Sequence, residues 1–163
     1  MIKRALLAVC VSVAAAGLAL AVAKKDDGWI EVSGIEVGLS EAGPVVFLKA
    51  RGRAMPIFVD PVVAASIQSA LGGPKPARPL SHDLMETILL AYGAKVTRAS
   101  ITLKEDVFYA ELRIVRDGKE ATFDSRSSDA IALSIRFGAP ILVREDQLEE
   151  TGKLLPGAGE RML

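Results

Sequence analysis

Two short polar segments of the 163-residue chain carry the side chains best suited to chemistry on an anionic group. The first spans residues 78–83 and contains the only histidine of the sequence, His82. The second spans residues 124–129 and alternates carboxylate, hydroxyl and guanidinium groups. Arginine can hold two phosphate oxygens through parallel hydrogen bonds, and carboxylates can orient a neighbouring group or bind a divalent cation. These residue types therefore indicate a site for a phosphate-like anion.

Both segments are expected at the beginning of a helix. Ser81 is a suitable N-cap, which would place His82 in the first turn, and residues 127–129 are expected to open a second helix. A helix N-terminus exposes backbone N–H groups and attracts anions. In that setting His82 is predicted to act as general base or general acid. Arg78 and Arg126 are predicted to hold the phosphate and to stabilise its charge in the transition state.

The carboxylates are predicted to orient His82 or to hold a metal ion. The catalytic candidates are His82, Asp83, Asp124 and Asp129, and the substrate-binding candidates are Arg78, Arg126 and Ser128. With one histidine in the chain, any metal is expected to be Mg²⁺ or Mn²⁺ on carboxylate oxygens, with Asp124 and Asp129 as candidate ligands. No organic cofactor is expected. The single cysteine excludes a cysteine-based zinc site, an iron–sulfur cluster and a disulfide within the chain.

Two simpler explanations of these residues stay open. Serine and aspartate are common in the first turn of any helix and serve there as caps. The arginines could pair with Asp83 and Asp124 in a structural ion-pair network. The functional interpretation requires that His82 and Asp129, 47 positions apart, meet at one pocket.

The elements that would position these segments follow a pattern that occurs twice. Strands are predicted over 29–39, 45–48 and 55–59, before a helix that begins at Asp60-Pro61. At an offset of 66 residues, strands around 101–103, over 108–114 and over 121–124 precede a helix that begins at residue 127. Two strand-strand-strand-helix units predict an internally duplicated α+β fold with a mostly antiparallel or mixed sheet packed with helices. Chance similarity of the hydrophobic patterns is the alternative to duplication.

The remaining elements complete one predicted domain over residues 29–147. A helix from Ser81 to about Tyr92 has a broad apolar face, and residues 141–143 form a last short strand. A terminal helix runs from Glu145 to about Gly152, so residues 148–163 are assigned to its end and to a loose tail.

The N-terminus is interpreted as a targeting segment. Lys3 and Arg4 precede an uncharged run over residues 5–23 that ends in small residues, and residues 24–28 form a polar linker. This pattern is typical of a secretory signal peptide cleaved after Ala23. An uncleaved membrane anchor is the alternative, because 19 residues almost span a bilayer. The protein is therefore expected to be exported, periplasmic or secreted, or anchored by residues 5–23.

Composition limits the class of protein. The chain is 50% hydrophobic and 25% charged with a formal net charge of zero, which is typical of a folded globular protein and excludes disordered or collagen-like chains. This charge balance permits a nucleic-acid partner without requiring one.

Several motifs together resemble the bifunctional nuclease domain family. They are RPLSHDL at 78–84, DSRSSDAIAL at 124–133, MPIFV at 55–59, FYA at 108–110 and GAPI at 138–141. The resemblance covers roughly residues 29–147 and implies a nuclease that acts on DNA and RNA as a wedge-shaped homodimer with its active site in a groove. It implies roles there for Arg78, His82, Asp83, Asp124, Arg126 and Asp129.

Three positions depart from the family pattern. Ser127 stands where the family usually has proline, and Asp60 and Val63 stand where it typically has glycine and glutamate. We therefore expect an exported nuclease of low sequence specificity that contacts a membrane only through its N-terminal segment. The alternative is a non-enzymatic dimeric module that binds an anionic ligand or a protein partner.

Overall fold

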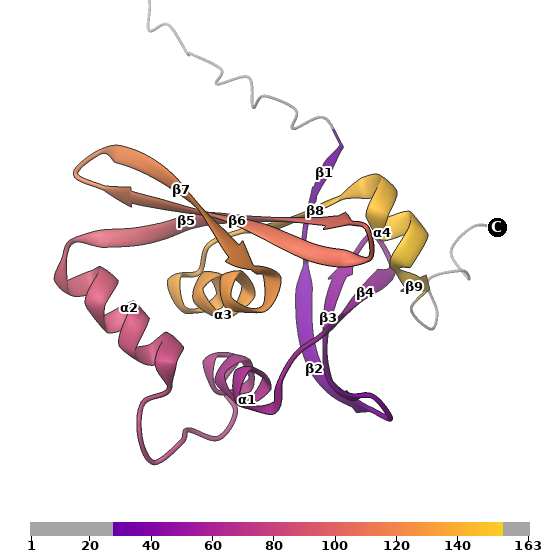
Figure 1. Cartoon of the computed structure of the whole chain (residues 1–163), viewed down its shortest axis with the longest axis horizontal. Helices are drawn as coiled ribbons and strands as arrows, with labels where there is room; N and C mark the ends of the chain where they lie inside the picture. The colour runs from indigo at the N-terminus through magenta and orange to yellow at the C-terminus, as the bar shows by residue number, and fades with distance from the viewer. Residues whose placement is uncertain (1–27, 155–163) are drawn as a thin grey trace, which may run out of the picture.

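The computed structural model describes residues 28–154, which form two sheets and four helices (Figure 1). The larger sheet is mixed, with strand order β1-β8-β5-β6-β7, and the smaller is antiparallel, with order β2-β3-β4-β9. The strands are β1 (Trp29–Glu31), β2 (Gly34–Ser40), β3 (Gly43–Ala50), β4 (Arg53–Phe58), β5 (Ala94–Lys104), β6 (Val107–Arg116), β7 (Lys119–Arg126), β8 (Ile141–Arg144) and β9 (Lys153–Leu154). The helices are α1 (Pro61–Ala70), α2 (Ser81–Ala91), α3 (Ser127–Phe137) and α4 (Glu145–Thr151). The predicted α+β class is confirmed.

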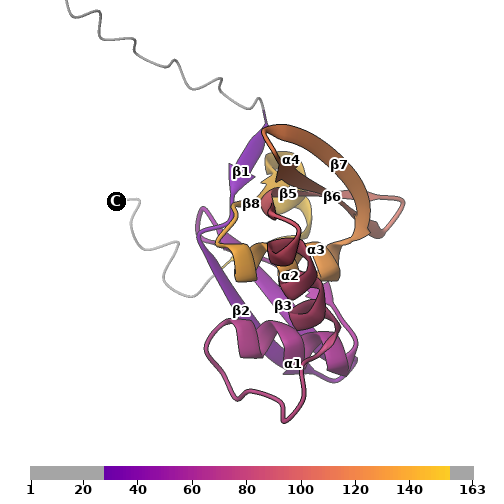
Figure 2. The ribbon, with the colours of Figure 1, turned by 90° about the vertical axis from the view of Figure 1, so that its left-hand side faces the viewer.

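Helix α3 occupies the centre of the fold. The larger sheet covers one side of it, α1 lies on the other, and α2 and the smaller sheet flank it (Figures 1 and 2). Its residues 130–133, two alanines with an isoleucine and a leucine, are at most 2% exposed and belong to one core with residues of both sheets and α1. Because α3 is packed on every side, the position of its N-terminus is fixed relative to α1 and α2.

The two predicted units have the same order of elements. In the first, β2, β3 and β4 lead into α1, and in the second, β5, β6 and β7 lead into α3. The turns Arg51-Gly52 and Asp117-Gly118, 66 residues apart, each place two consecutive residues at positive φ. Each closes a two-residue hairpin, which is the type I′ geometry favoured between twisted strands. An origin of the two units by duplication stays a prediction.

The strand predicted over residues 29–39 is split between the two sheets. β1 pairs with β8, whereas β2 pairs with β3. Between them, the Val32 N–H donates to Ile141 of the larger sheet and the Ser33 N–H donates to Lys49 of the smaller one. The one-strand prediction was wrong because alternating polarity continues across a point where the backbone changes its partner. The strand predicted over 121–124 is longer, since β7 covers residues 119–126.

The start of α2 also differs from the prediction. Leu80, not Ser81, is the N-cap, and Ser81 is the first helical residue. A leucine side chain cannot cap, and the Leu80 N–H is satisfied instead by the carboxylate of Asp83, which accepts it at 2.8 Å. Much of the predicted apolar face of α2 is exposed, with Leu84 57% and Tyr92 66% accessible.

The fold continues to Leu154. Leu148 of α4 is buried, and β9 pairs with β4. The predicted signal peptide or anchor, most of the predicted linker, and residues 155–163 of the predicted tail lie outside the described residues. Within residues 28–154, no helix has the length and apolar character needed to cross a membrane.

Candidate active site

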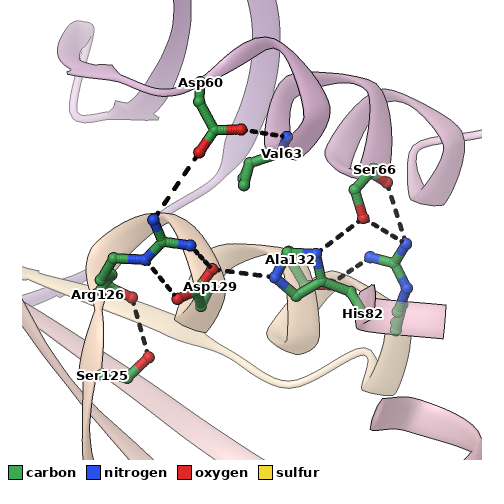
Figure 3. A network of polar contacts seen from close by, with 9 residues as sticks. Asp60, Val63, Ser66, His82, Ser125, Arg126, Asp129 and Ala132 are labelled. Carbon is green, nitrogen blue, oxygen red and sulfur yellow. Dashed lines mark hydrogen bonds and ion pairs between the residues drawn. The ribbon is translucent and has the colours of Figure 1, made fainter. Parts of the chain in front are cut away.

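His82 and Asp129 meet between α2 and α3 (Figure 3). The Nε2 atom of His82 lies 3.1 Å from Oδ1 of Asp129, and His82 is 5% exposed. Each residue occupies the first turn of its own helix, so the N-termini of α2 and α3 lie close together at this contact. The predicted convergence of residues 47 positions apart is therefore confirmed.

Arg126 binds Asp129 through two hydrogen bonds. Its Nε donates to Oδ2 at 2.7 Å and its Nη2 donates to Oδ1 at 2.8 Å. Burial raises the pKa of Asp129, but the hydrogen bonds from Arg126 and His82 outweigh it, so that the pKa is lower than that of an ordinary aspartate. The hydrogen bonds to Asp129 raise the pKa of Arg126. Asp129 is thus held as a carboxylate, and the Arg126 side chain, 66% exposed, carries the positive charge to the surface.

The second nitrogen of His82 is also in contact with protein. Its Nδ1 lies 2.9 Å from the hydroxyl of Ser66 on α1, which is fully buried. Both ring nitrogens therefore have partners, and direct proton transfer by His82 to a substrate requires one of these contacts to open.

Ser66 is in turn held by Arg136, near the end of α3. The Nη2 of Arg136 donates to the Ser66 hydroxyl at 2.9 Å and to its carbonyl at 3.1 Å. The same guanidinium donates to Asp83 Oδ1 at 2.8 Å and to the Ala132 carbonyl at 2.8 Å, and it is 4% exposed. The hydrogen bond from Arg136, and next the one from the Leu80 N–H, lower the pKa of Asp83. Polar contacts thus run from Asp83 to Arg126 through three helices.

A cavity of about 310 Å³ opens onto this network. It is lined by Asp60, Val62, Val63, Ser66, Leu80, Ser81, His82, Met85, Arg126 and Asp129. Asp60 is the N-cap of α1, as predicted, since its Oδ1 accepts the Val63 N–H at 3.0 Å. Its other oxygen faces Arg126 Nη1 at 3.8 Å. Within residues 28–154 this ion pair is the one contact of Nη1 with a side chain, so Nη1 can donate to a ligand in the cavity.

The other predicted site residues lie outside this cavity. Arg78 is exposed and lines a separate cavity of about 600 Å³ together with Asp83. Asp124 lines an adjoining cavity that also reaches Arg126 and Asp129. Ser128 is buried and is not among the residues lining the cavity of His82. The two predicted phosphate-binding arginines are therefore not brought to one pocket.

The predicted structural ion pairs also have different partners. Asp83 pairs with Arg136 rather than Arg78, and Arg126 pairs with Asp129 rather than with Asp124. Ser66 and Arg136 were not identified from the sequence. A serine and an arginine within otherwise apolar helical stretches were the available signals.

The predicted metal ligands do not form a metal site by themselves. Within residues 28–154, no group of three or more histidine, cysteine or acidic side chains is placed to hold a cation. Both oxygens of Asp129 accept hydrogen bonds from Arg126, so a cation would compete with that guanidinium for the carboxylate. Asp124 and Asp129 therefore do not form a ready-made cation site. Dependence of activity on Mg²⁺ or Mn²⁺ stays a prediction.

Comparison with known proteins gives two findings. Residues 45–155 match the sequence profile of the bifunctional nuclease domain. Two uncharacterized proteins of Mycobacterium tuberculosis, from strains CDC 1551 and H37Rv, are each 37% identical to the chain over 132 residues, which is 79% of this chain and 79% of each relative.

Proposed function

The chain belongs to the bifunctional nuclease domain family, and from this membership we propose that it hydrolyses phosphodiester bonds of RNA and DNA with little sequence preference. The observation that carries the proposal is the cavity at Arg126 and Asp129, where an arginine and an ionised carboxylate lie side by side at the surface. Nucleic-acid cleavage needs a cation for the phosphate and an acceptor for the proton of the attacking water.

In this proposal Arg126 holds the phosphate. Its Nε and Nη2 donate to Asp129, whereas among the described residues 28–154 the contact of Nη1 is the 3.8 Å ion pair with Asp60. Nη1 and the second hydrogen of Nη2 can donate to non-bridging phosphate oxygens. The charge on these oxygens increases as the water attacks, and a fixed guanidinium stabilises it most at that point.

Asp129 is the group that faces the attacking water. Each carboxylate oxygen has two lone pairs, and Oδ2 receives one hydrogen bond, from Arg126 Nε. The other lone pair can accept a hydrogen bond from water and then its proton, while the water oxygen bonds to phosphorus. The bond from phosphorus to the leaving ribose or deoxyribose oxygen breaks, and that oxygen takes a proton from solvent. His82 orients Asp129 through Nε2 in this scheme.

A second copy of the chain is proposed as the partner of the exposed apolar face. Ile88 of α2, Tyr92 directly after the last residue of that helix, and Phe123 of β7 are exposed. Between them lies a mainly apolar cavity of about 570 Å³. An apolar surface of this kind is typical of an interface. A third cavity, of about 490 Å³, shares Phe123 with the apolar cavity and Met85 with the site cavity, so the proposed homodimer would place the candidate site close to its interface.

Export is likewise part of the proposal. The basic start and the uncharged run over residues 5–23 support cleavage after Ala23. Mass spectrometry of the chain recovered outside the cytoplasm of its host would give Lys24 as the first residue. Recovery of the intact chain in the membrane fraction would support the anchor.

A second candidate function is a binding module without catalysis. Val63 lines the site cavity at a position where members of the bifunctional nuclease domain family typically have glutamate. If that carboxylate is needed for cleavage, this chain would bind nucleic acid and leave it intact.

Incubation of the full chain with labelled single-stranded RNA and DNA decides between the two functions. The reactions contain EDTA, Mg²⁺ or Mn²⁺, and the products are resolved by length. Cleavage that is lost in the Asp129→Asn variant supports the nuclease. Salt-dependent binding without cleavage in any of the three conditions supports the binding module.

A further inference from the structure

We infer that Ser66 is a positioning residue for the candidate site, with its hydroxyl turned toward His82 by Arg136. This inference rests on the proposed function for its catalytic consequence, but its structural content stands on contacts among α1, α2 and α3 alone. Ser66 is fully buried and does not need to touch substrate. It acts by fixing which nitrogen of His82 carries the proton.

Arg136 sets the direction of the Ser66 hydroxyl. A guanidinium group is always a donor, so the 2.9 Å contact between Arg136 Nη2 and Ser66 Oγ uses Oγ as the acceptor. The single hydrogen of the hydroxyl is then free to point at the other neighbour of Oγ, Nδ1 of His82 at 2.9 Å. Within residues 28–154 the contacts of Oγ are those with Arg136 and Nδ1, so a proton on Nδ1 would leave the hydrogen of this buried hydroxyl without an acceptor. Nδ1 therefore accepts from Ser66.

Arg136 cannot easily turn away from this position. Its side chain is 4% exposed, Nε donates to Asp83, and Nη1 donates to the Ala132 carbonyl. Nη2 shares its two hydrogens among Asp83 and the carbonyl and hydroxyl of Ser66. Asp83 is itself fixed by the Leu80 N–H at the start of α2. The orientation of the Ser66 hydroxyl is thus determined by residues of all three helices.

Asp129, on the opposite side of the ring, also requires the tautomer with the proton on Nε2. Its carboxylate is ionised and can only accept, so Nε2 of His82 must carry the proton in the 3.1 Å contact. The alternative, with the proton on Nδ1, would place the Nε2 lone pair against the carboxylate. Donation runs in one direction, from Arg136 to Ser66, to His82 and to Asp129.

For the proposed nuclease this direction matters because it occupies Oδ1 of Asp129 twice, by His82 and by Arg126 Nη2. Water can then approach the lone pair left on Oδ2. Loss of Ser66 would leave Nδ1 of His82 without its donor and would loosen the ring that fixes this carboxylate.

The single histidine makes the tautomer directly measurable, because the imidazole nitrogens of the ¹⁵N-labelled full chain come from one residue. In the wild type we expect protonation at Nε2 and a hydrogen-bonded, unprotonated Nδ1. Ser66→Ala should move the Nδ1 resonance toward that of a free acceptor nitrogen. Ser134→Ala is the matched control, since Ser134 is equally buried and its hydroxyl has no partner within residues 28–154.

The Asp129→Asn background isolates the contribution of Ser66. Asparagine can donate or accept, so Ser66 alone then selects the tautomer. We expect Asp129→Asn to keep the proton on Nε2, and the Ser66→Ala/Asp129→Asn double variant to populate both tautomers. A wild-type proton on Nδ1, or an Nδ1 resonance that is the same in Ser66→Ala and the wild type, overturns the inference even if the double variant does not fold.

Kinetics separate this inference from the proposed function. If the wild type cleaves RNA or DNA, Ser66→Ala should lower kcat about tenfold with little change in KM, while Ser134→Ala stays near wild type. Equal kcat in the two variants contradicts the positioning role. Absence of cleavage in the wild type removes the nuclease proposal and leaves the tautomer measurement as it stands.

Discussion

Arg126 and Asp129 are joined by two parallel hydrogen bonds, of 2.7 and 2.8 Å, across the junction between β7 and α3. They are three residues apart, and the helix begins between them. This places a rigid ion pair at the mouth of the cavity that contains His82. The Arg126 side chain is mostly exposed and that of Asp129 is mostly covered. The pair therefore presents a hydrogen-bond donor to solvent and an acceptor to the cavity.

Replacement of Arg126 by alanine is expected to reduce cleavage about a hundredfold, because it removes the cation that would meet the phosphate. Arg126→Lys should recover little activity, since an ammonium group cannot hold Asp129 and a phosphate in one plane. Rates on single-stranded RNA measure both effects. Arg78→Ala serves as the comparison, because Arg78 lines a different cavity. A larger loss from Arg78→Ala than from Arg126→Ala would place the phosphate elsewhere.

Substitutions at His82 distinguish proton transfer from orientation of Asp129. His82→Ala should cost about a hundredfold or more in rate under either role, because the contact with Asp129 is lost. His82→Gln can still donate to Asp129 from the position of Nε2, but glutamine does not transfer protons. We expect His82→Gln to retain much of the activity that His82→Ala loses. Equal losses in the two variants would assign the proton transfer to His82, and near-native cleavage by His82→Ala would exclude His82 from the mechanism.

Local sequence features predicted the elements that carry the site. Asp60-Pro61 and Ser127-Ser128-Asp129 begin helices as predicted, because caps and first-turn residues act within four positions of each other. The meeting of His82 with Asp129 followed from the expectation that two polar helix starts share an anion. The fold class followed from the order of elements alone.

Contacts between distant residues that no polar motif marks could not be predicted. Ser66 contacts His82 16 positions away and Arg136 70 positions away, and hydrophobic periodicity gives no information on such partners. For the same reason Asp83 was assigned to catalysis, whereas the structure shows its carboxylate shared between Arg136 and the Leu80 N–H. The chain passes from the larger sheet to the smaller one near Val32. This was not predicted because β1 and β2 continue the same alternation of polar and apolar residues.

The exposed face of α2 leads to a prediction about assembly. Ile88→Lys and Phe123→Lys place a charge on an apolar surface and should convert the proposed homodimer into a monomer in sedimentation velocity experiments. Leu39→Lys is the matched control, because Leu39 is 83% exposed on β2, in the other sheet. If the wild type sediments as a monomer, or if Leu39→Lys alone dissociates it, α2 is not the interface.

The ion pair of Asp83 with buried Arg136 predicts how stability depends on pH. The folded state lowers the pKa of Asp83, through Arg136 first and the Leu80 N–H second, and it also lowers that of Asp129. An aspartate in the unfolded chain titrates near pH 3.9. The unfolded state therefore binds protons at a higher pH than the folded state does. The contribution of both carboxylates is complete above about pH 4 to 5 and decreases as the pH falls through their lowered values.

Urea denaturation between pH 2.5 and 7 measures this contribution. Asp83→Asn should lower the free energy of unfolding at pH 7 by at least about 1 kcal/mol, because Arg136 stays buried without its strongest acceptor. Its stability should also change less than that of the wild type between pH 5 and 3. Glu86→Gln is the control, since Glu86 approaches the same guanidinium only to 3.7 Å and its loss should have a smaller effect at pH 7. An Asp83→Asn variant that loses stability on acidification as steeply as the wild type would show that Asp83 does not couple Arg136 to folding.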